Sequence, residues 1–421
     1  MCNLTKYKLS LEINTNKMKY KLSIILILSS IIAESQVLSS RKGNTHNKSE
    51  FQISLIYPIG TNGGNSYNIT NNFSINLIAG INGGVNGMEF GGFLNIDKQE
   101  VHGIQLAGFG NLNGGNTNGI QMSGFFNVNK GSMGGLQLAG FTNLNSGSCR
   151  GIQGAGFLNY NRDSEQIVQL AGFGNISGSF DGIQAAGFFN FSRTAGTADS
   201  VDVLKNYDFL KSGMQLAGFV NVAEDVRGIQ VAGFANVAKN VEGIMVAGFI
   251  NICDSINGVP VAFINYVKKN GYRRISVWSN EIFYLNTSFK MGIPQFYTIF
   301  NLGYRPEVNN INWCAGAGFG TTIHVNGNKY LDLEGMHHTI FDETIWDYES
   351  DYRYHSLNQL KISFRYEMKN RLSVFGGPDF NILVSPVSEN IKDIKPSWAK
   401  HYSSRHNTIY TWFGFNAGVS F

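Results

Sequence analysis

The chain has 421 residues, enough for several ordinary domains or for one large β domain. Only 15% of the residues are charged, the formal net charge is +4, and no stretch strings lysine and arginine together with aromatic residues as a nucleic-acid groove would. Nucleic acid is therefore excluded as an expected partner. Fifty glycines and many asparagines indicate turns and strands rather than long helices, so an all-β fold is expected.

The N-terminus resembles an export signal. Lys17, Lys19 and Lys21 precede an apolar run, Leu22–Ala33, that small and polar residues follow. The run is too short for a membrane-spanning helix, which needs about 20 residues, and it matches a secretory signal peptide. We assign residues 1–36 to this signal, with Met18 as an alternative start, and residues 37–50 to a short polar segment.

Alternating strands come next. Residues 51–86 contain "FQISLIYPIG" and "NFSINLIAGI", in which every second residue is apolar. This period of two is typical of β-strands with one apolar face. We expect residues 51–86 to form the first strands of a β-barrel.

A repeat fills residues 87–267. "GIQLAGFGNLNGGNTN" is followed directly by "GIQMSGFFNVNKGSMG", and each further copy begins 15 or 16 residues after the last. One longer interval contains the insertion 193–212, which we expect to be a loop. The copies begin at Gly87, Gly103, Gly119, Gly135, Gly151, Ile167, Gly182, Gly213, Gly228, Gly243 and Gly258.

Each copy has an uncharged side and a polar side. Ile104 and Leu106 alternate with Gln105, Phe109 and Asn111, and the same alternation recurs in later copies. Segments of about ten alternating residues, separated by turns, are typical of a transmembrane antiparallel β-barrel with a polar lumen. Over the whole chain the candidate strands predict a barrel of about twenty strands.

A β-solenoid is the alternative that this pattern leaves open. Short coils that stack on one another also give a fixed period, with ladders of identical Phe and Asn side chains and a glycine at each corner. In that case the flanking strands would close a smaller barrel of about ten to twelve strands.

The segment 268–421 is expected to form C-terminal barrel strands. In "QLKISFRYEMK" apolar residues alternate with Lys361, Arg365 and Glu367, as expected for a strand between lipid and water. The chain ends on Phe421, and Phe413, Phe415 and Val419 share its face in the last strand. Bacterial outer-membrane barrels resemble this ending, which implies that these four residues act as an insertion signal.

The repeats also carry a family resemblance. The GIQLAGFxN copies, the opening "FQISLIYPIGTNG" and the ending "GVSF" resemble surface-repeat outer-membrane proteins of Bacteroidota and spirochaetes. The likeness covers Phe51 to Phe421 and implies an outer-membrane address, but it carries over no catalytic or ligand residue. The last copy, "GVPVAFINYV", departs from the pattern because Pro260 replaces glutamine.

No motif indicates an enzyme. "GAGFG" at residues 316–320 lies in an alternating strand with no helix after it, and the acidic stretch that contains His337 and His338 fits no metal-ligand spacing. Three cysteines remain after the signal, which predicts no disulfide framework. We expect no catalytic residue, no cofactor and no metal.

The expected function is an integral outer-membrane barrel that serves as a passive pore or a structural surface protein. The alternatives are an adhesin or binding protein that presents a solenoid and, last, an outer-membrane enzyme. Expected partners are outer-membrane lipid and the barrel-assembly machinery, with lipopolysaccharide or an extracellular ligand as further candidates. The expected lumen-lining residues are Gln105, Phe109, Asn111, Gln121, Asn127, Gln230, Asn236, Lys361, Arg365 and Glu367.

Overall fold

A computed structural model gives the fold of residues 47–196, 212–306, 311–342, 355–368, 372–386, 395–403 and 407–421. All of them except Asn47 belong to one compact unit, Lys48–Phe421. The predicted signal peptide and most of the polar segment 37–50 lie outside the described residues. Within the described ranges, no helix is long and apolar enough to cross a membrane.

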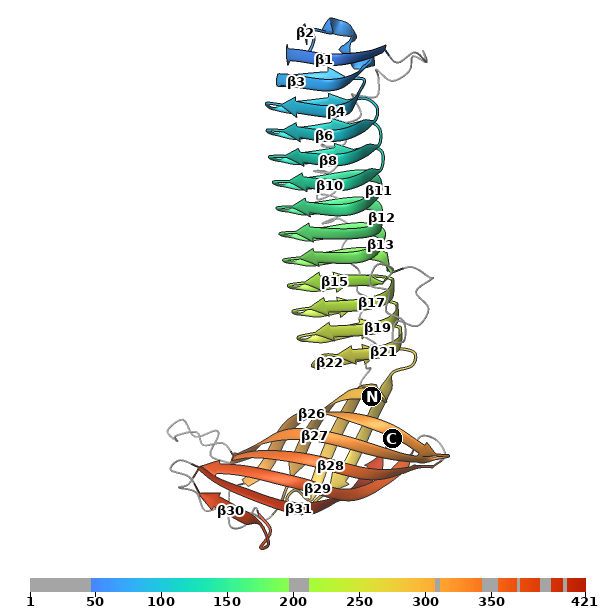
Figure 1. The fold of residues 1–421 in the computed structure, drawn as a ribbon. Helices are drawn as coiled ribbons and strands as arrows, with labels where there is room; N and C mark the ends of the chain where they lie inside the picture. Colours follow the sequence, from blue (N-terminus) through green and yellow to red (C-terminus); the bar gives the residue numbers. More distant parts are fainter. Residues whose placement is uncertain are drawn as a thin grey trace, which may run out of the picture. The chain divides into compact units, whose positions relative to one another are not determined.

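The repeats form a parallel β-solenoid of about 11 coils (Figure 1). Each coil contributes one longer and one shorter strand segment, and every segment pairs in parallel with its copy in the next coil. Gln105, for example, lies opposite Gln121. The strands are β4 (Gly84–Gly91), β5 (Leu94–Asp97), β6 (Val101–Ala107), β7 (Gly110–Asn113), β8 (Thr117–Ser123), β9 (Phe126–Asn129), β10 (Met133–Ala139), β11 (Thr142–Ala155), β12 (Leu158–Ala171), β13 (Gly174–Ala186), β14 (Phe189–Ala195), β15 (Gly213–Ala217), β16 (Val220–Val222), β17 (Asp225–Ala232), β18 (Ala235–Val237), β19 (Asn240–Ala247), β20 (Ile250–Cys253), β21 (Ser255–Val261) and β22 (Ile264–Val267).

This arrangement overturns the expected twenty-stranded antiparallel barrel. The alternation within each copy is the same in a barrel strand and in a solenoid coil, so it could not separate the two. Parallel pairing in register brings every repeated residue against its own copy, which an antiparallel hairpin does not do. The prediction of a barrel wall built from the repeats is therefore wrong.

The segment 51–86 also belongs to the solenoid sheet and not to a barrel. It contains β1 (Asn47–Ile56), β2 (Ile59–Gly60), a 3₁₀ helix (Gly63–Asn68) and β3 (Ile69–Asn82). β3 pairs in parallel with β4 and β5, and β1 pairs with β2 and β3. The first strands thus cover the N-terminal end of the stack.

The insertion leaves the stack unbroken. β13 pairs directly with β15, so that Gly182 lies opposite Gly213 on the far side of the insertion. Arg193, Thr194 and Ala195 still belong to β14, so the loop begins later than the predicted residue 193. Residues 197–211 lie outside the described part of the chain.

The C-terminal part is a closed antiparallel sheet (Figure 1). β23 pairs with β31, so eight strands close a ring, while β30 (Lys400–Ser403) adds only to one end of β31. The ring has fewer strands than the ten to twelve expected beside a solenoid. Its strands are β23 (Tyr272–Ser279), β24 (Leu285–Ile293), β25 (Phe296–Tyr304), β26 (Ile311–Asn326), β27 (Lys329–Asp342), β28 (His355–Glu367), β29 (Ser373–Pro386) and β31 (Asn407–Ser420).

Candidate binding surface

The interior of the solenoid is built around an asparagine ladder. The side-chain amide of Asn111 donates to Oδ1 of Asn127 at 2.8 Å and to the Met122 carbonyl at 2.9 Å, so both of its hydrogens are used. Asn127 repeats both bonds one coil further on, with Asn143 and Leu138. These asparagines are fully buried. Because each repeated amide is the partner of the next, the ladder fixes the register of the coils.

A glutamine ladder runs beside it in the opposite direction. The amide of Gln121 donates to Oε1 of Gln105 at 2.9 Å, and Gln137 donates to Gln121 at 2.8 Å. Its NH₂ groups therefore point toward the N-terminus, whereas those of the asparagine ladder point toward the C-terminus. The amide dipoles of the two ladders oppose each other. Both ladders stabilise a largely polar core by hydrogen bonds between neighbouring coils.

Two carboxyl groups replace amides at the N-terminal end of the ladders. Glu89 lies opposite Gln105 and Asp97 opposite Asn113, and both side chains are buried. The Gln105 amide donates to Glu89 at 2.9 Å and to Asp97 at 2.6 Å. Burial raises the pKa of Glu89 and raises that of Asp97 well above its usual range, to which the charge on Glu89 also contributes.

We expect Asp97→Asn to remove a pH-dependent loss of stability. A raised carboxyl pKa in the folded state means that the stability is complete below the ordinary value of 3.8 and is lost as the pH rises. An amide at this position would need no proton and would match Asn113 in register. The variant should therefore be more stable than the parent at pH 7, and its stability should fall less as the pH rises. Urea unfolding from pH 3 to pH 8 measures this.

The reciprocal change provides the control. Asn113→Asp places a second carboxyl group in the same buried column, so it should lower stability at pH 7 and make the pH dependence steeper. If Asp97→Asn kept the pH profile of the parent, Asp97 would not be its source.

A glycine and a phenylalanine form the corner between the two strands of each coil. Strand β6 ends at Ala107 and β7 begins at Gly110. At the corner the Gly108 N–H donates to the Gly91 carbonyl at 2.9 Å, and the Phe109 N–H donates to the Phe93 carbonyl at 2.9 Å. The strand is therefore interrupted, and Phe109 at the corner leaves the buried side, while Asn111 beyond the corner faces inward again like Gln105.

The corner phenylalanines form a continuous ladder on the outer surface, exposed except for the half-buried Phe109. Neighbouring rings are stacked with centroids 4.6 Å apart for Phe93 and Phe109 and 4.8 Å apart for Phe125 and Phe141. The stack continues across the insertion, where Phe188 and Phe219 are 4.9 Å apart. The ladder consists of Phe93, Phe109, Phe125, Phe141, Phe157, Phe173, Phe188, Phe219, Phe234, Phe249 and Phe263.

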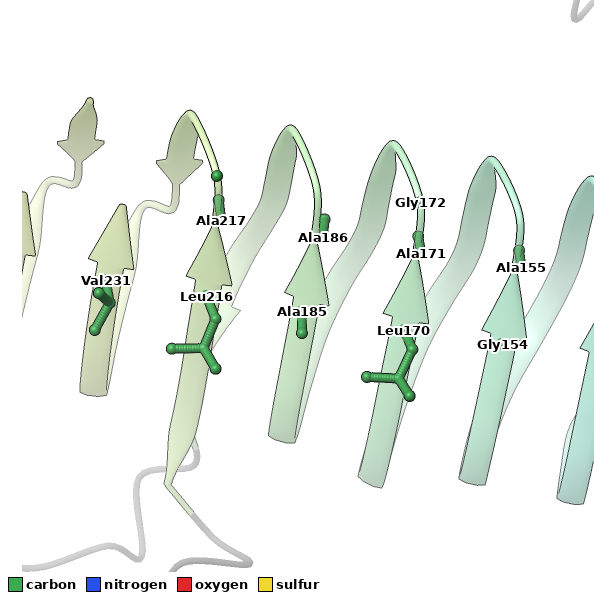
Figure 2. Close-up of a pocket in the computed structure, with 11 residues that line it drawn as sticks. Gly154, Ala155, Leu170, Ala171, Gly172, Ala185, Ala186, Leu216, Ala217 and Val231 are labelled. Carbon is green, nitrogen blue, oxygen red and sulfur yellow. The ribbon is translucent and has the colours of Figure 1, made fainter. Parts of the chain in front are cut away.

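Apolar rows flank this ladder on both faces of the solenoid. Figure 2 shows Leu170, Ala185 and Leu216 on three successive strands. Together with the alanines and glycines before each corner they line a shallow groove of about 600 Å³. On the other face, Tyr160 and Phe191 point outward and are 42% and 45% exposed. Large apolar side chains thus lie outside and amides inside.

The closed sheet has the same inverted arrangement. Lys361 Nζ lies 3.4 Å from Glu334 and 3.6 Å from the Trp278 ring centroid, and Lys290 also pairs with Glu334. These side chains are buried inside the ring. A second buried ion pair joins Arg365 Nε and Asp332 at 2.8 Å. The outward residues are large and apolar, with Phe364 65%, Leu302 63% and Phe413 73% exposed.

The predicted lumen residues divide into three groups. Gln105, Asn111, Gln121, Asn127, Gln230 and Asn236 face inward and are fully buried, but in the core of the solenoid and not in a pore. Phe109 lies at the corner, outside that core, which corrects its predicted position. Lys361 and Arg365 are buried in the closed sheet, and Glu367 is bonded to Arg274 at 2.9 Å near its rim. Phe413, Phe415 and Phe421 point outward and are exposed, and Val419 is half-buried.

The barrel interpretation placed the repeated phenylalanines in a lumen, whereas the solenoid alternative expected them to stack in a ladder beside a glycine corner. The signal of this ladder is the Gly-Phe pair at a fixed place in every copy, because a glycine that must approach the neighbouring backbone marks a corner. An added Cβ on Gly124 would lie 2.1 Å from the Gly108 carbonyl oxygen. Fold and surface together define an all-β repeat protein with a parallel solenoid. Comparisons with protein-family models, curated proteins and solved structures found no significant match to the chain.

Proposed function

We propose that this chain is an exported, non-enzymatic surface protein of the bacterial outer membrane. In this proposal the closed sheet is the membrane anchor and the solenoid is the binding part. One observation carries it: charged and amide side chains face inward, while large apolar side chains face outward. The resemblance of the GIQLAGFxN copies to surface-repeat proteins supports the same address.

The closed sheet has the properties that a lipid environment requires. In the described residues each strand of the ring has a paired neighbour on both sides, because β23 pairs with the end of β31, and hydrocarbon tolerates only backbone groups that are bonded within the protein. The outward side chains Phe364, Leu302 and Phe413 suit contact with acyl chains, whereas in water they would form a large exposed apolar surface. The exposed aromatic residues of the last strand fit recognition by the barrel-assembly machinery.

The interior of the closed sheet argues against a passive pore. Lys361, Glu334, Arg365 and Asp332 are at most 4% exposed, and their ion pairs cross the space that a solute would need. Eight strands enclose just enough room for side chains to fill. The closed sheet is therefore an anchor whose interior is occluded. In this proposal a ligand binds to the solenoid.

The anchor makes a specific prediction at Phe364. An arginine in contact with the bilayer midplane costs about 2–4 kcal/mol, whereas an ordinary substitution on a water-exposed surface costs within about 0.5 kcal/mol. We expect Phe364→Arg to destabilise the protein folded into phospholipid vesicles by about 2 kcal/mol or more. The measurement is a urea titration of the vesicle-bound protein.

Tyr402→Arg is the matched control. Tyr402 is 63% exposed, nearly as much as Phe364, but lies on β30 outside the ring. It should tolerate arginine with little change. Equal effects of the two substitutions, or a neutral Phe364→Arg, would show that the outer face of the ring is in contact with water.

A further inference from the structure

A continuous apolar band runs along the solenoid. We define the band as five rows of side chains that run along the solenoid axis. Each row consists of one residue of a single coil and the residues in register with it in the other coils. The five residues of that coil are Ile120, Met122, Phe125, Phe126 and Val128. The register runs through all the coils. None of the five rows contains a charged residue.

In the described coils the charged side chains that face outward lie on the opposite edge. Lys130, Glu165 and Lys239 lie in the connections between one coil and the next, and Lys239 pairs with Glu224 at 3.1 Å. The row next to that of Ile120 contains Arg227 and Glu242, which pair at 3.3 Å. Each coil thus has one charged edge and, across the strands from it, the phenylalanine edge.

The polar groups beneath the band are paired within the protein. The strands use their backbone groups in the parallel ladder, and the N–H groups at the corner bond to the carbonyls of the previous coil. The inward amides bond to one another, as Asn127 does with Asn143. A surface of this kind exposes almost no polar group that hydrocarbon would leave unsatisfied.

The height of the band lies within one leaflet of a bilayer. Ile120 and Phe125 are five residues apart, and because β8 ends at Ser123 and the chain turns there, the distance between them is at most about 16 Å. Half of the hydrocarbon core of a bilayer is about 15 Å. The rows therefore fit within the depth of the acyl chains, and the first charges lie beyond them.

From this charge distribution and height we infer that the phenylalanine edge of the solenoid inserts into a single phospholipid leaflet. The inference rests on the proposed function and names the partner of its binding part. A glycan fits less well, because sugar hydroxyls need hydrogen-bonding partners, and the five rows carry side-chain hydroxyls only at Thr142, Tyr160 and Tyr266. A second copy of the chain is the competing occupant.

Nitroxide labels on cysteines test the inference in the full chain reconstituted into phospholipid vesicles. Phe141→Cys and Leu144→Cys place labels in the band, and Lys130→Cys places one on the charged edge. Phe413→Cys reports on the anchor. The parent chain, labelled in parallel, gives the background from its own cysteines, of which Cys149, Cys253 and Cys314 are buried.

We expect both band labels to collide readily with oxygen, which dissolves in lipid. They should collide several-fold less than the Lys130→Cys label with a water-soluble nickel complex. Two band sites are used so that a local effect of losing one stacked ring cannot decide the result.

Three other outcomes would overturn the inference or its basis. Band labels open to the nickel complex, with the Phe413→Cys label still in lipid, would refute the leaflet contact and leave the anchor intact. Band labels shielded from both reagents would show that protein, such as a second copy, covers the band. A Phe413→Cys label in water would refute the proposed function itself.

Discussion

Gly119→Ala is expected to abolish stable stacking of the solenoid. Gly119 has φ +137°, and an added Cβ would lie 2.0 Å from the carbonyl oxygen of Gly103 in the previous coil. Neither atom can move away alone, because both belong to paired backbone. Strain of this backbone conformation costs about 1–3 kcal/mol, and the clash adds to it, for a total loss of about 4 kcal/mol or more in the free energy of unfolding.

Gly64→Ala is the control for this prediction. A Cβ at Gly64 meets no atom within 4 Å, and its φ does not lie in the left-handed range. Urea unfolding followed by circular dichroism should separate the two variants widely. If Gly119→Ala lowered the free energy of unfolding as little as Gly64→Ala, neighbouring coils could not lie as close together at Gly103 and Gly119 as the structure shows.

Asn143→Leu is expected to have the second largest effect. It removes the acceptor of the Asn127 amide and the donor to Asn159 and to the Gly154 carbonyl, all in a fully buried column. Each buried polar group left without its partner costs about 1–3 kcal/mol, so the loss should reach about 2–5 kcal/mol. The leucine is similar in size, which separates the lost hydrogen bonds from a change in volume.

The neighbouring residue provides the control. Leu144 lies on the same strand but faces outward and is only half-buried. In detergent-free water Leu144→Asn should cost less than about 1 kcal/mol, close to an ordinary surface substitution. A larger loss at Leu144 than at Asn143 would place the core on the other side of the strand.

The sequence predicted the strands and the direction of the amide side chains better than it predicted the fold. Alternation placed Gln105 and Asn111 on one side and Ile104 on the other, and the structure buries the amides and turns the isoleucine outward. The alternation did not predict whether neighbouring strands run parallel or antiparallel, because both have the same period of two. The polar side was therefore interpreted as a pore lumen.

The signal that could have decided between the folds is the identity of the repeated residues themselves. A side-chain amide bonds well to a copy of itself one coil away, and a phenylalanine stacks well on a phenylalanine, but only when strands are parallel and in register. Asn111 above Asn127 and Phe109 beside Phe125 illustrate this. An antiparallel barrel gives no physical reason to keep the same residue at the same place in each copy.

Closure of the C-terminal sheet could not be derived from the sequence. Alternation in "QLKISFRYEMK" separates Lys361 and Arg365 from Phe364, but the pairing of β23 with β31 joins segments at opposite ends of that region. The carboxylates that pair with these cations lie on another strand, β27, as Glu334 and Asp332. Such long-range pairs depend on strand order, which composition and period do not reveal.

Disulfide trapping between coils tests the central claim most directly. Leu112 lies opposite Val128 in the parallel register. Adjacent strands are about 4.8 Å apart, within the Cα separation of about 4.4–6.8 Å that a disulfide spans. We predict that Leu112→Cys with Val128→Cys cross-links on mild oxidation and that Leu112→Cys with Leu144→Cys, two coils apart, does not. In the alternative antiparallel barrel, the chain would turn at residues 113–118. Residue 112 would then lie beside the turn and residue 128 at the far end of the next strand, too distant to cross-link. Failure of the first pair to cross-link in the folded protein would therefore contradict the solenoid.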